Sequence, residues 1–208
     1  MSFKEALKKV WYFLWEEESI WSWIANVVLA FVIIKFLLYP GLGWALGTRA
    51  PIVAVISGSM EHEGNFDQFW SDPMCCNPPC NAQLAQGKYY EKINISREQF
   101  RDYDFVNGFN KGDIIVLYSP KKVDIGEVIV YIAQNRPDPI IHRVIRMSEE
   151  NGVKYYWTKG DHNCDVGGFE ASIPENRVVG KAVWRVPFLG WVKIIAVDLW
   201  QLAAGGFR

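Results

Sequence analysis

The chain has almost no net charge, few histidines and few cysteines, and each shortage narrows what it can do. Its 22 basic and 23 acidic residues give a formal net charge of −1 over 208 residues. It therefore lacks the basic surface that nucleic acid requires, and we expect no nucleic-acid partner. Only three histidines are present, so few side chains can exchange a proton near neutral pH. The four cysteines match no common zinc spacing.

Three cysteines (Cys75, Cys76 and Cys80) lie in the loop-like stretch 72–80, and Cys164 lies far along the chain. The adjacent pair is not expected to bond to itself, because a vicinal disulfide strains the backbone. If this region faces an oxidising compartment, at least one disulfide is the favoured state. A metal site and free thiols stay open as alternatives.

One long apolar run stands out. Residues 20–46 are almost wholly apolar, and Trp21–Tyr39 alone approaches the ~20 residues that a bilayer core requires. A cleavable signal peptide is disfavoured, because the run is too long and three glutamates directly precede it. We expect residues 20–47 to form an uncleaved transmembrane anchor whose helix breaks at Pro40 and the glycines after it.

The two terminal segments, residues 1–19 and 188–208, are each expected to form a helix that lies in the membrane surface. In residues 1–19, apolar side chains recur at helical spacing and the lysines lie off that face, which favours an interfacial helix over an ordinary surface helix. Three lysines before the anchor, against Arg49 after it, favour a cytoplasmic N-terminus. In residues 188–208, the polar side chains share one helical sector, which favours a surface-lying helix over a second span.

Residues 48–187 are expected to form an extracytoplasmic β-domain. Short β-prone runs between residues 111 and 186 are separated by turn signals, including Asn151-Gly152 at the centre of an expected hairpin. This rhythm predicts a mainly β fold, either a small barrel or a folded sheet. Residues 61–110 lack this pattern of short strands and turns and are interpreted as an aromatic-rich insertion. The insertion carries a short helix expected to start at Ser96 and the weak glycosylation triplet Asn94-Ile95-Ser96.

Candidate catalytic residues lie at the edges of these strand-like runs. Ser59 follows an apolar stretch and stands next to Gly58, which permits a tight turn. A serine hydroxyl needs a base, and His142, in an alternating strand, is one candidate. Asp161 or Asp165 could orient the imidazole. Two other histidines are rival bases: His62 and His162. The alternative interpretations give these residues purely structural roles: Ser59 in an ordinary turn, His142 in the core, and the two aspartates in turns.

Taken together, these residues resemble a known family. In chain order, the motifs are Ser57-Gly58-Ser59-Met60-Glu61, Lys111-Gly112-Asp113-Ile114, Ile141-His142-Arg143-Val144, Thr158-Lys159-Gly160-Asp161 and Val179-Gly180-Lys181. After an N-terminal anchor, they resemble the type I signal peptidases. The His-Arg-Val form is similar to the archaeal and endoplasmic-reticulum branch, in which histidine replaces a lysine base.

The resemblance implies a role for each matching residue. Ser59 would attack the carbonyl at the end of a signal peptide, and His142 would be its general base. Asp165 would orient His142, and Asp161 would support the site. The backbone N–H of Ser59 and the hydroxyl of Ser57 would bind the oxyanion. No cofactor or metal is implied, and the implied partners are preproteins with signal peptides, the bilayer and, as an open case, the secretion translocon.

The chain departs from the family pattern at several positions. His62 stands where a proline is usual, and His162 stands where an asparagine is usual. Asp165 comes slightly early, which leaves Asp161 as its rival, and the insertion 61–110 replaces a short link. We therefore also consider a membrane protease with narrower, regulatory targets. A further alternative is an inactive anchored β-domain that binds partners through the insertion.

Overall fold

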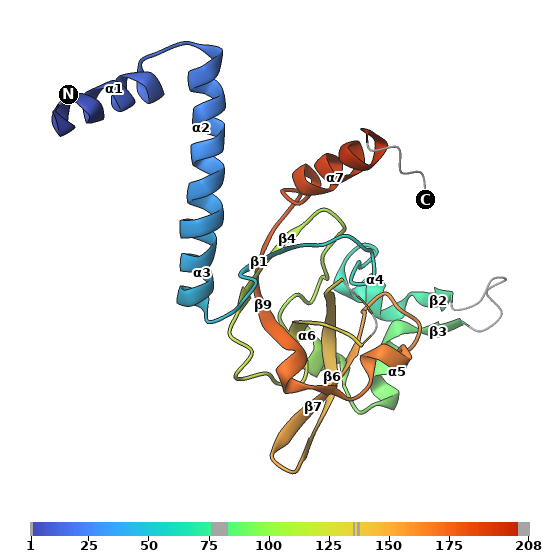
Figure 1. Cartoon of the computed structure of the whole chain (residues 1–208). Coiled ribbons are helices and arrows are strands. Elements are labelled where there is room, and N and C mark those ends of the chain that lie inside the picture. The colour runs from blue at the N-terminus through green and yellow to red at the C-terminus, as the bar shows by residue number, and fades with distance from the viewer. Residues whose placement is uncertain (1, 76–82, 135, 137, 204–208) are drawn as a thin grey trace. The chain divides into compact units, whose positions relative to one another are not determined.

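The computed structural model describes residues 2–75, 83–134, 136 and 138–203 (Figure 1). The chain divides into two compact units, residues 1–45 and 46–208. The first unit is helical, and the second contains the β-sheet and most of the short helices.

The helical unit begins with α1 (Phe3–Trp15), which confirms the helix expected at the N-terminus. Ser2 and Glu5 form a capping box at its start, and none of its residues is buried. The next helix, α2 (Ile20–Ile33), starts at Ser19, whose side chain accepts a hydrogen bond from the N–H of Ser22. The carboxamide of Asn26 donates to the carbonyl of Leu14 at 2.7 Å, which ties α1 to α2.

The apolar helix does not break at Pro40, so that expectation is wrong. It continues through a π-helical turn, η1 (Ile34–Leu38), into α3 (Tyr39–Leu46). In this turn the N–H of Tyr39 reaches back five residues to the carbonyl of Ile34. The wider turn leaves room for the Pro40 ring, which in a regular α-helix collides with the carbonyl four residues earlier.

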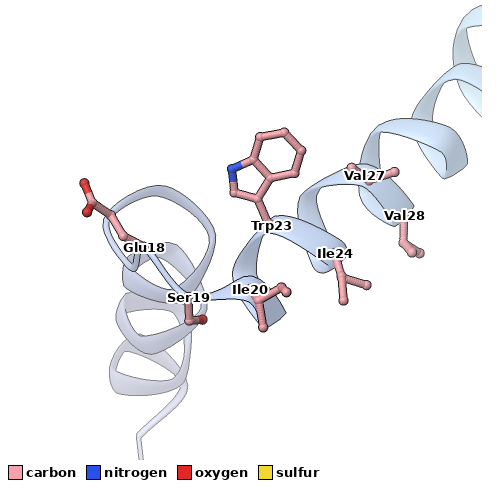
Figure 2. Close-up of a pocket in the computed structure, with 7 residues that line it drawn as sticks. All are labelled: Glu18, Ser19, Ile20, Trp23, Ile24, Val27 and Val28. Atoms are coloured by element: carbon pink, nitrogen blue, oxygen red, sulfur yellow. The ribbon is translucent and has the colours of Figure 1, made fainter.

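Within the described part of the chain, residues 20–46 form the one helix that is long and apolar enough to cross a membrane. It has 27 residues, and an 18-residue stretch of it has a mean hydropathy of 2.1. A recess of about 440 Å³ lies along its start (Figure 2), where apolar side chains project outward from the helix. Its lining residues are Glu18, Ser19, Ile20, Trp23, Ile24, Val27 and Val28. Outward-facing apolar side chains are what lipid-exposed helices carry.

A curled, antiparallel, seven-stranded sheet forms the second unit, which confirms the expected fold class. Its spatial order is β1-β4-β9-β5-β6-β7-β8. The strands are β1 (Ile52–Ala54), β4 (Ile114–Tyr118), β5 (Val128–Tyr131), β6 (Ile140–Glu150), β7 (Val153–Lys159), β8 (Ile173–Pro174) and β9 (Val178–Val186). All four residues of β5 are buried, with alternate side chains in two different hydrophobic clusters. The sheet therefore curls around β5 and covers both of its faces.

The longest strands, β6 and β7, form the expected hairpin. Asn151 and Gly152 join them, with φ of 52° and 76°. Two consecutive positive φ values belong to a type I′ turn, whose twist matches that of the paired strands. The hairpin brings the start of β6 and the end of β7 to the same end of the ladder, where Arg143 pairs with Lys159.

The insertion folds as a small unit of its own. Its elements are α4 (Phe66–Ser71), β2 (Pro73–Cys75), β3 (Gln83–Ala85), α5 (Gln86–Lys92) and α6 (Arg97–Arg101). Ser96 caps α6 as expected. An aromatic cluster centred on the fully buried Phe100 packs the insertion against Ile145 of β6. The chain's last described helix is α7 (Trp191–Ala203), and residues 204–208 of the expected C-terminal helix lie outside the described residues.

Candidate active site

Ser59 lies in a tight turn five residues after the end of β1 at Ala54. The N–H of Glu61 donates to the carbonyl of Gly58 at 3.0 Å, which closes the turn around Ser59. The side chain of Glu61 then accepts a hydrogen bond from the N–H of Lys111 at 3.0 Å. The turn is therefore fastened to the segment before β4, and the half-buried Ser59 hydroxyl has a fixed position.

The Oγ of Ser59 lies 2.9 Å from the Nε2 of His142. His142 is 4% exposed and sits near the start of β6, opposite Ile129 of β5. Pairing with β5 and the buried surroundings hold the imidazole in place. The two side chains that the sequence singled out as nucleophile and base are thus in hydrogen-bonding contact across 83 residues of chain.

The other ring nitrogen of His142, Nδ1, contacts the carboxylate of Glu170, and both side chains are almost fully buried. Glu170 ends η2 (Gly168–Glu170), a single 3₁₀ turn, and its second oxygen accepts a hydrogen bond from the N–H of Gly167. The turn therefore fixes the carboxylate against the ring. Glu170 was not among the residues predicted from the sequence. The Gly167-x-x-Glu170 spacing, which resembles a capping box, was the signal that could have found it.

Asp165, the residue expected to orient His142, lies elsewhere. It is exposed, and its carboxylate accepts a hydrogen bond from the N–H of Val166 at 2.7 Å. It also interacts with the hydroxyl of Tyr89. Burial, first, and the nearby charge of Asp165 raise the pKa of Tyr89 to about 12.

Asp161 is fully buried, and four donors surround its carboxylate. Tyr90 Oη and Arg143 Nε donate to Oδ1 at 2.9 and 3.0 Å. His62 Nε2 and Arg143 Nη2 lie 3.0 and 2.7 Å from Oδ2. Burial alone would raise the pKa of Asp161, but the Arg143 guanidinium and the hydrogen bonds outweigh it and hold the pKa well below its usual value. Asp161 is thus an ionised anchor for Arg143, the neighbour of His142.

The structure gives the two rival bases other surroundings. The Nε2 of His62 lies 3.0 Å from Oδ2 of Asp161, and His162 is exposed. Lys159, the lysine alternative, is buried, and its ammonium donates to Gln86 Oε1 and to the carbonyls of Gly160 and Asp161. Burial lowers the pKa of Lys159 to about 8 despite the opposing charge of Asp161. All three donors of its ammonium are occupied, so it is held as a structural cation.

Gly160 packs directly against the reacting pair. A Cβ atom at this position would lie 2.7 Å from the carbonyl oxygen of Ser59 and 2.8 Å from Nε2 of His142. Contacts this short are forbidden, so glycine is required for this close approach. The N–H of His162 donates to the same carbonyl of Ser59 at 2.9 Å. The loop 160–162 is therefore in direct contact with both the serine and the histidine.

A groove of about 550 Å³ opens beside Ser59 and His142. Residues 54–57 after and within β1 line one side, and Ile140 and Ile141 of β6 line the other. β1 is the terminal strand of the sheet, and β7 pairs with β6 only from Arg143 onward. Backbone groups on both sides of the groove are thus free to pair with an extended peptide. The hydroxyl of Ser57 lies 3.2 Å from that of Ser59 and faces the same groove.

Cys164, the cysteine whose side chain the structure describes, does not line this groove. Cys164 is disulfide-bonded, whereas Cys76 and Cys80 lie outside the described residues. Among the residues that the structure describes, no group of three or more metal-ligating side chains comes together.

Comparison with known proteins gives several relatives that share one description. No protein-family model matches the chain. The signal peptidase complex catalytic subunit sec11 of Schizosaccharomyces pombe is 38% identical over 166 residues, which is 77% of this chain and 74% of the relative. The SEC11 subunit of Yarrowia lipolytica is 26% identical over 171 residues, 79% of this chain and 73% of the relative. Human SEC11C is 35% identical over 98 residues, 43% of this chain and 51% of the relative. The chain therefore belongs to the family of signal peptidase complex catalytic subunits, which confirms its resemblance to the type I signal peptidases.

Proposed function

We propose that this chain is a membrane-anchored serine endopeptidase that removes N-terminal signal peptides from exported preproteins. The contact between Ser59 and His142, 2.9 Å at the edge of a peptide-sized groove, carries the proposal. Its sequence relatives are named as catalytic subunits of the signal peptidase complex, which supports the same reaction.

The reaction begins when Ser59 Oγ attacks the scissile carbonyl and transfers its proton to Nε2 of His142. A tetrahedral intermediate forms, and it collapses when His142 returns that proton to the leaving amine. The acyl-enzyme is then hydrolysed by a water molecule that His142 deprotonates in turn. Each step needs Nε2 free to accept a proton, so the hydrogen on the neutral ring must sit on Nδ1.

Glu170 takes the orienting role that the family resemblance gave to Asp165. Its buried carboxylate accepts the Nδ1–H of His142, selects the required tautomer and stabilises the imidazolium that forms during attack. Asp161 acts one step further out, by holding Arg143 and the 160–162 loop. Glu170 therefore orients His142 and Asp161 supports the site, whereas the sequence left the orienting role open between Asp161 and Asp165.

The negative charge on the substrate oxygen is stabilised by the backbone N–H of Ser59 and by the hydroxyl of Ser57. The Ser57 hydroxyl is 3.2 Å from the nucleophile and exposed to the groove, so it can reach an oxyanion formed at Ser59. The substrate lies extended along the free edges of β1 and β6. Val55, which directly follows β1, and Ile141 of β6 contribute apolar lining next to the nucleophile.

We further propose that residues 20–47 span the bilayer with a cytoplasmic N-terminus, so that residues 48–187 work outside the cytoplasm. Residues 1–19 and 188–208 then lie in the membrane surface. Signal peptides are apolar and enter the same bilayer, so anchoring raises their effective concentration at the groove. Because the relatives are subunits of a complex, this chain is expected to work with other subunits near the translocon.

The proposal is tested with the purified full chain in lipid vesicles and a panel of unrelated preproteins. A general signal peptidase cuts each one at the end of its signal peptide, and the Ser59→Ala variant cuts none. Cleavage of a single preprotein from the panel would instead indicate the narrower, regulatory protease. An absence of cleavage across the panel, with correctly folded protein and with the partner subunits added, would contradict the proposed activity.

A further inference from the structure

The insertion supplies two of the four donor groups that surround the carboxylate of Asp161. Two donor groups belong to Arg143 of β6, and the other two, Tyr90 Oη and His62 Nε2, belong to residues 61–110. Each carboxylate oxygen is contacted both by Arg143 and by one donor of the insertion. A buried ionised carboxylate needs its acceptor positions filled, so removing a donor of the insertion leaves an acceptor position of Asp161 unfilled.

The position of Asp161 passes directly to the reacting pair. Gly160, which precedes Asp161, packs against the Ser59 carbonyl and the His142 ring. His162, which follows Asp161, donates its backbone N–H to the same Ser59 carbonyl. On the other side, Arg143 directly follows His142 in β6 and also donates to the carbonyls of Asp104 and Phe105. A shift of Asp161 would therefore move both Ser59 and His142.

His62 itself is firmly held. Its side chain is completely buried, and its ring stacks on Phe69 with 3.6 Å between centroids and 1° between planes. Tyr90 is also fully buried, and its ring contacts that of Phe100 at 4.7 Å. Both donors thus sit in the aromatic cluster of the insertion, which sets their position.

We propose that the insertion 61–110 is part of the catalytic scaffold and that His62 and Tyr90 are positioning residues for the Ser59–His142 pair. This inference rests on the proposed peptidase function and deepens it. His62 and Tyr90 act on the reaction only through Asp161. An insertion that merely covered the surface or bound a partner would not need these two contacts.

The test compares kcat and KM of full-chain variants on one preprotein, alongside their thermal unfolding midpoints. His62→Phe keeps the ring on Phe69 and removes the donor, and Tyr90→Phe removes one hydroxyl. Each is expected to lower kcat about ten- to hundredfold, with KM within about twofold of the wild type. His62→Gln places an amide N–H near the position of Nε2 and is expected to recover most of the lost kcat. Tyr89→Phe, which removes a hydroxyl facing Asp165, is the matched control and keeps wild-type kcat.

The inference is overturned if His62→Phe and Tyr90→Phe cleave at the wild-type rate, or if His62→Gln is no better than His62→Phe. An equal loss in Tyr89→Phe would also contradict it. If His62→Phe does not fold, Tyr90→Phe alone decides, because it removes a single oxygen. The proposed function fails separately, when the wild type shows no Ser59-dependent cleavage.

A different observation concerns Asn94, which begins the triplet Asn94-Ile95-Ser96. Asn94 is exposed in the turn after α5, with φ of 64°, and its carboxamide has no hydrogen-bond partner in the described part of the chain. Ile95 is buried, and Ser96 caps α6 by accepting the N–H of Gln99. None of the residues that line the groove beside Ser59 comes from the insertion, so a group attached here would leave the groove open.

We also propose that Asn94 is an N-glycosylation site, given the extracytoplasmic placement proposed above. The donor is a lipid-diphosphate-linked oligosaccharide. A bond forms between Nδ2 of Asn94 and the anomeric carbon, the bond from that carbon to the diphosphate oxygen breaks, and Nδ2 loses one proton. The exposed carboxamide can carry the sugar without breaking any hydrogen bond of the folded chain.

The full chain is translated in the presence of microsomes, and its mobility is compared before and after peptide N-glycosidase. The wild type and Ser96→Thr are expected to shift by one glycan. Asn94→Gly, which tolerates the positive φ, and Ser96→Asp, which keeps the helix cap, are expected not to shift. Val153→Thr serves as the reference, because it creates a second acceptor triplet at the exposed Asn151-Gly152 turn. If the Val153→Thr variant carries a glycan at Asn151 but none at Asn94, this inference is overturned. If neither position carries a glycan, the proposed orientation is contradicted.

Discussion

The carboxylate of Glu170 contacts Nδ1 of His142, while Nε2 of the same ring faces Ser59. The imidazole is thus held between an acid and an alcohol, and each nitrogen has a defined partner. Such an arrangement fixes the tautomer in which Nε2 can accept a proton. Glu170 is buried and held by its own 3₁₀ turn, so the ring orientation is set before a substrate arrives.

This relationship predicts that Glu170→Gln lowers kcat strongly. The amide can offer its N–H to Nδ1 and favour the wrong tautomer, and it cannot balance the imidazolium, so a loss of about 10³- to 10⁴-fold is expected. Asp165→Asn is the control, because that carboxylate is exposed and bonds its own loop. Steady-state cleavage of one preprotein measures both. The opposite ranking, with Asp165→Asn the more damaging, would return the orienting role to Asp165.

Gly160→Ala is expected to cost activity through direct contact with the reacting pair. The added methyl would meet a backbone oxygen and His142 Nε2 at under 3 Å, and neither can move without disturbing Ser59. We expect kcat to fall about a hundredfold. Gly168→Ala, where the added methyl meets nothing within 4 Å, is expected to behave as the wild type. An active Gly160→Ala variant would show that the 160–162 loop is loosely coupled to the site.

Ser57→Ala is expected to slow the enzyme without inactivating it. The hydroxyl contributes one of two proposed oxyanion donors, and loss of one such donor typically costs about 10²- to 10³-fold in kcat. KM should change little, because the interaction strengthens only as charge develops on the substrate oxygen. The separate values of kcat and KM decide the matter: an increase in KM alone would place Ser57 in substrate binding rather than in oxyanion stabilisation.

The buried carboxylate of Asp161 is expected to make the folded protein less stable in acid. Its pKa is held below the usual 3.8 in the folded chain, so the unfolded chain takes up the proton first as pH falls below about 4, and unfolding becomes easier. The stabilisation is complete at neutral pH and declines by at most about 1.4 kcal/mol per pH unit. Thermal midpoints of the wild type should exceed those of Asp161→Asn near pH 7, and the gap should narrow progressively as the pH falls below about 4. A gap that is independent of pH would contradict this role.

Much of the sheet could be predicted from local pattern. The runs at Ile114–Tyr118 and Val153–Lys159 are rich in β-branched and aromatic residues, and Asn151-Gly152 specifies the turn between β6 and β7. Ser59 and His142 could be paired only through the family resemblance, because residue chemistry alone left His62 and His162 as rival bases.

The rest depends on geometry that sequence spacing does not contain. Glu170 reaches His142 because a 3₁₀ turn reverses the chain after Gly167, whereas Asp165, closer to the Gly-Asp motif, points to solvent. Pro40 does not end its helix, because a π-helical turn directly before it widens the backbone. The function of His62 could not be seen either, since its partner Asp161 lies 99 residues away in the chain.

We propose above all that Ser59 is the nucleophile and that His142 activates it. This is tested most directly by cleavage of a preprotein by the wild type, Ser59→Ala and His142→Ala at equal protein concentration, with folding checked by the thermal unfolding midpoint. Both variants are expected to fold and to lose cleavage at the signal-peptide junction. If folded Ser59→Ala cleaves at a rate near that of the wild type, Ser59 is not the nucleophile.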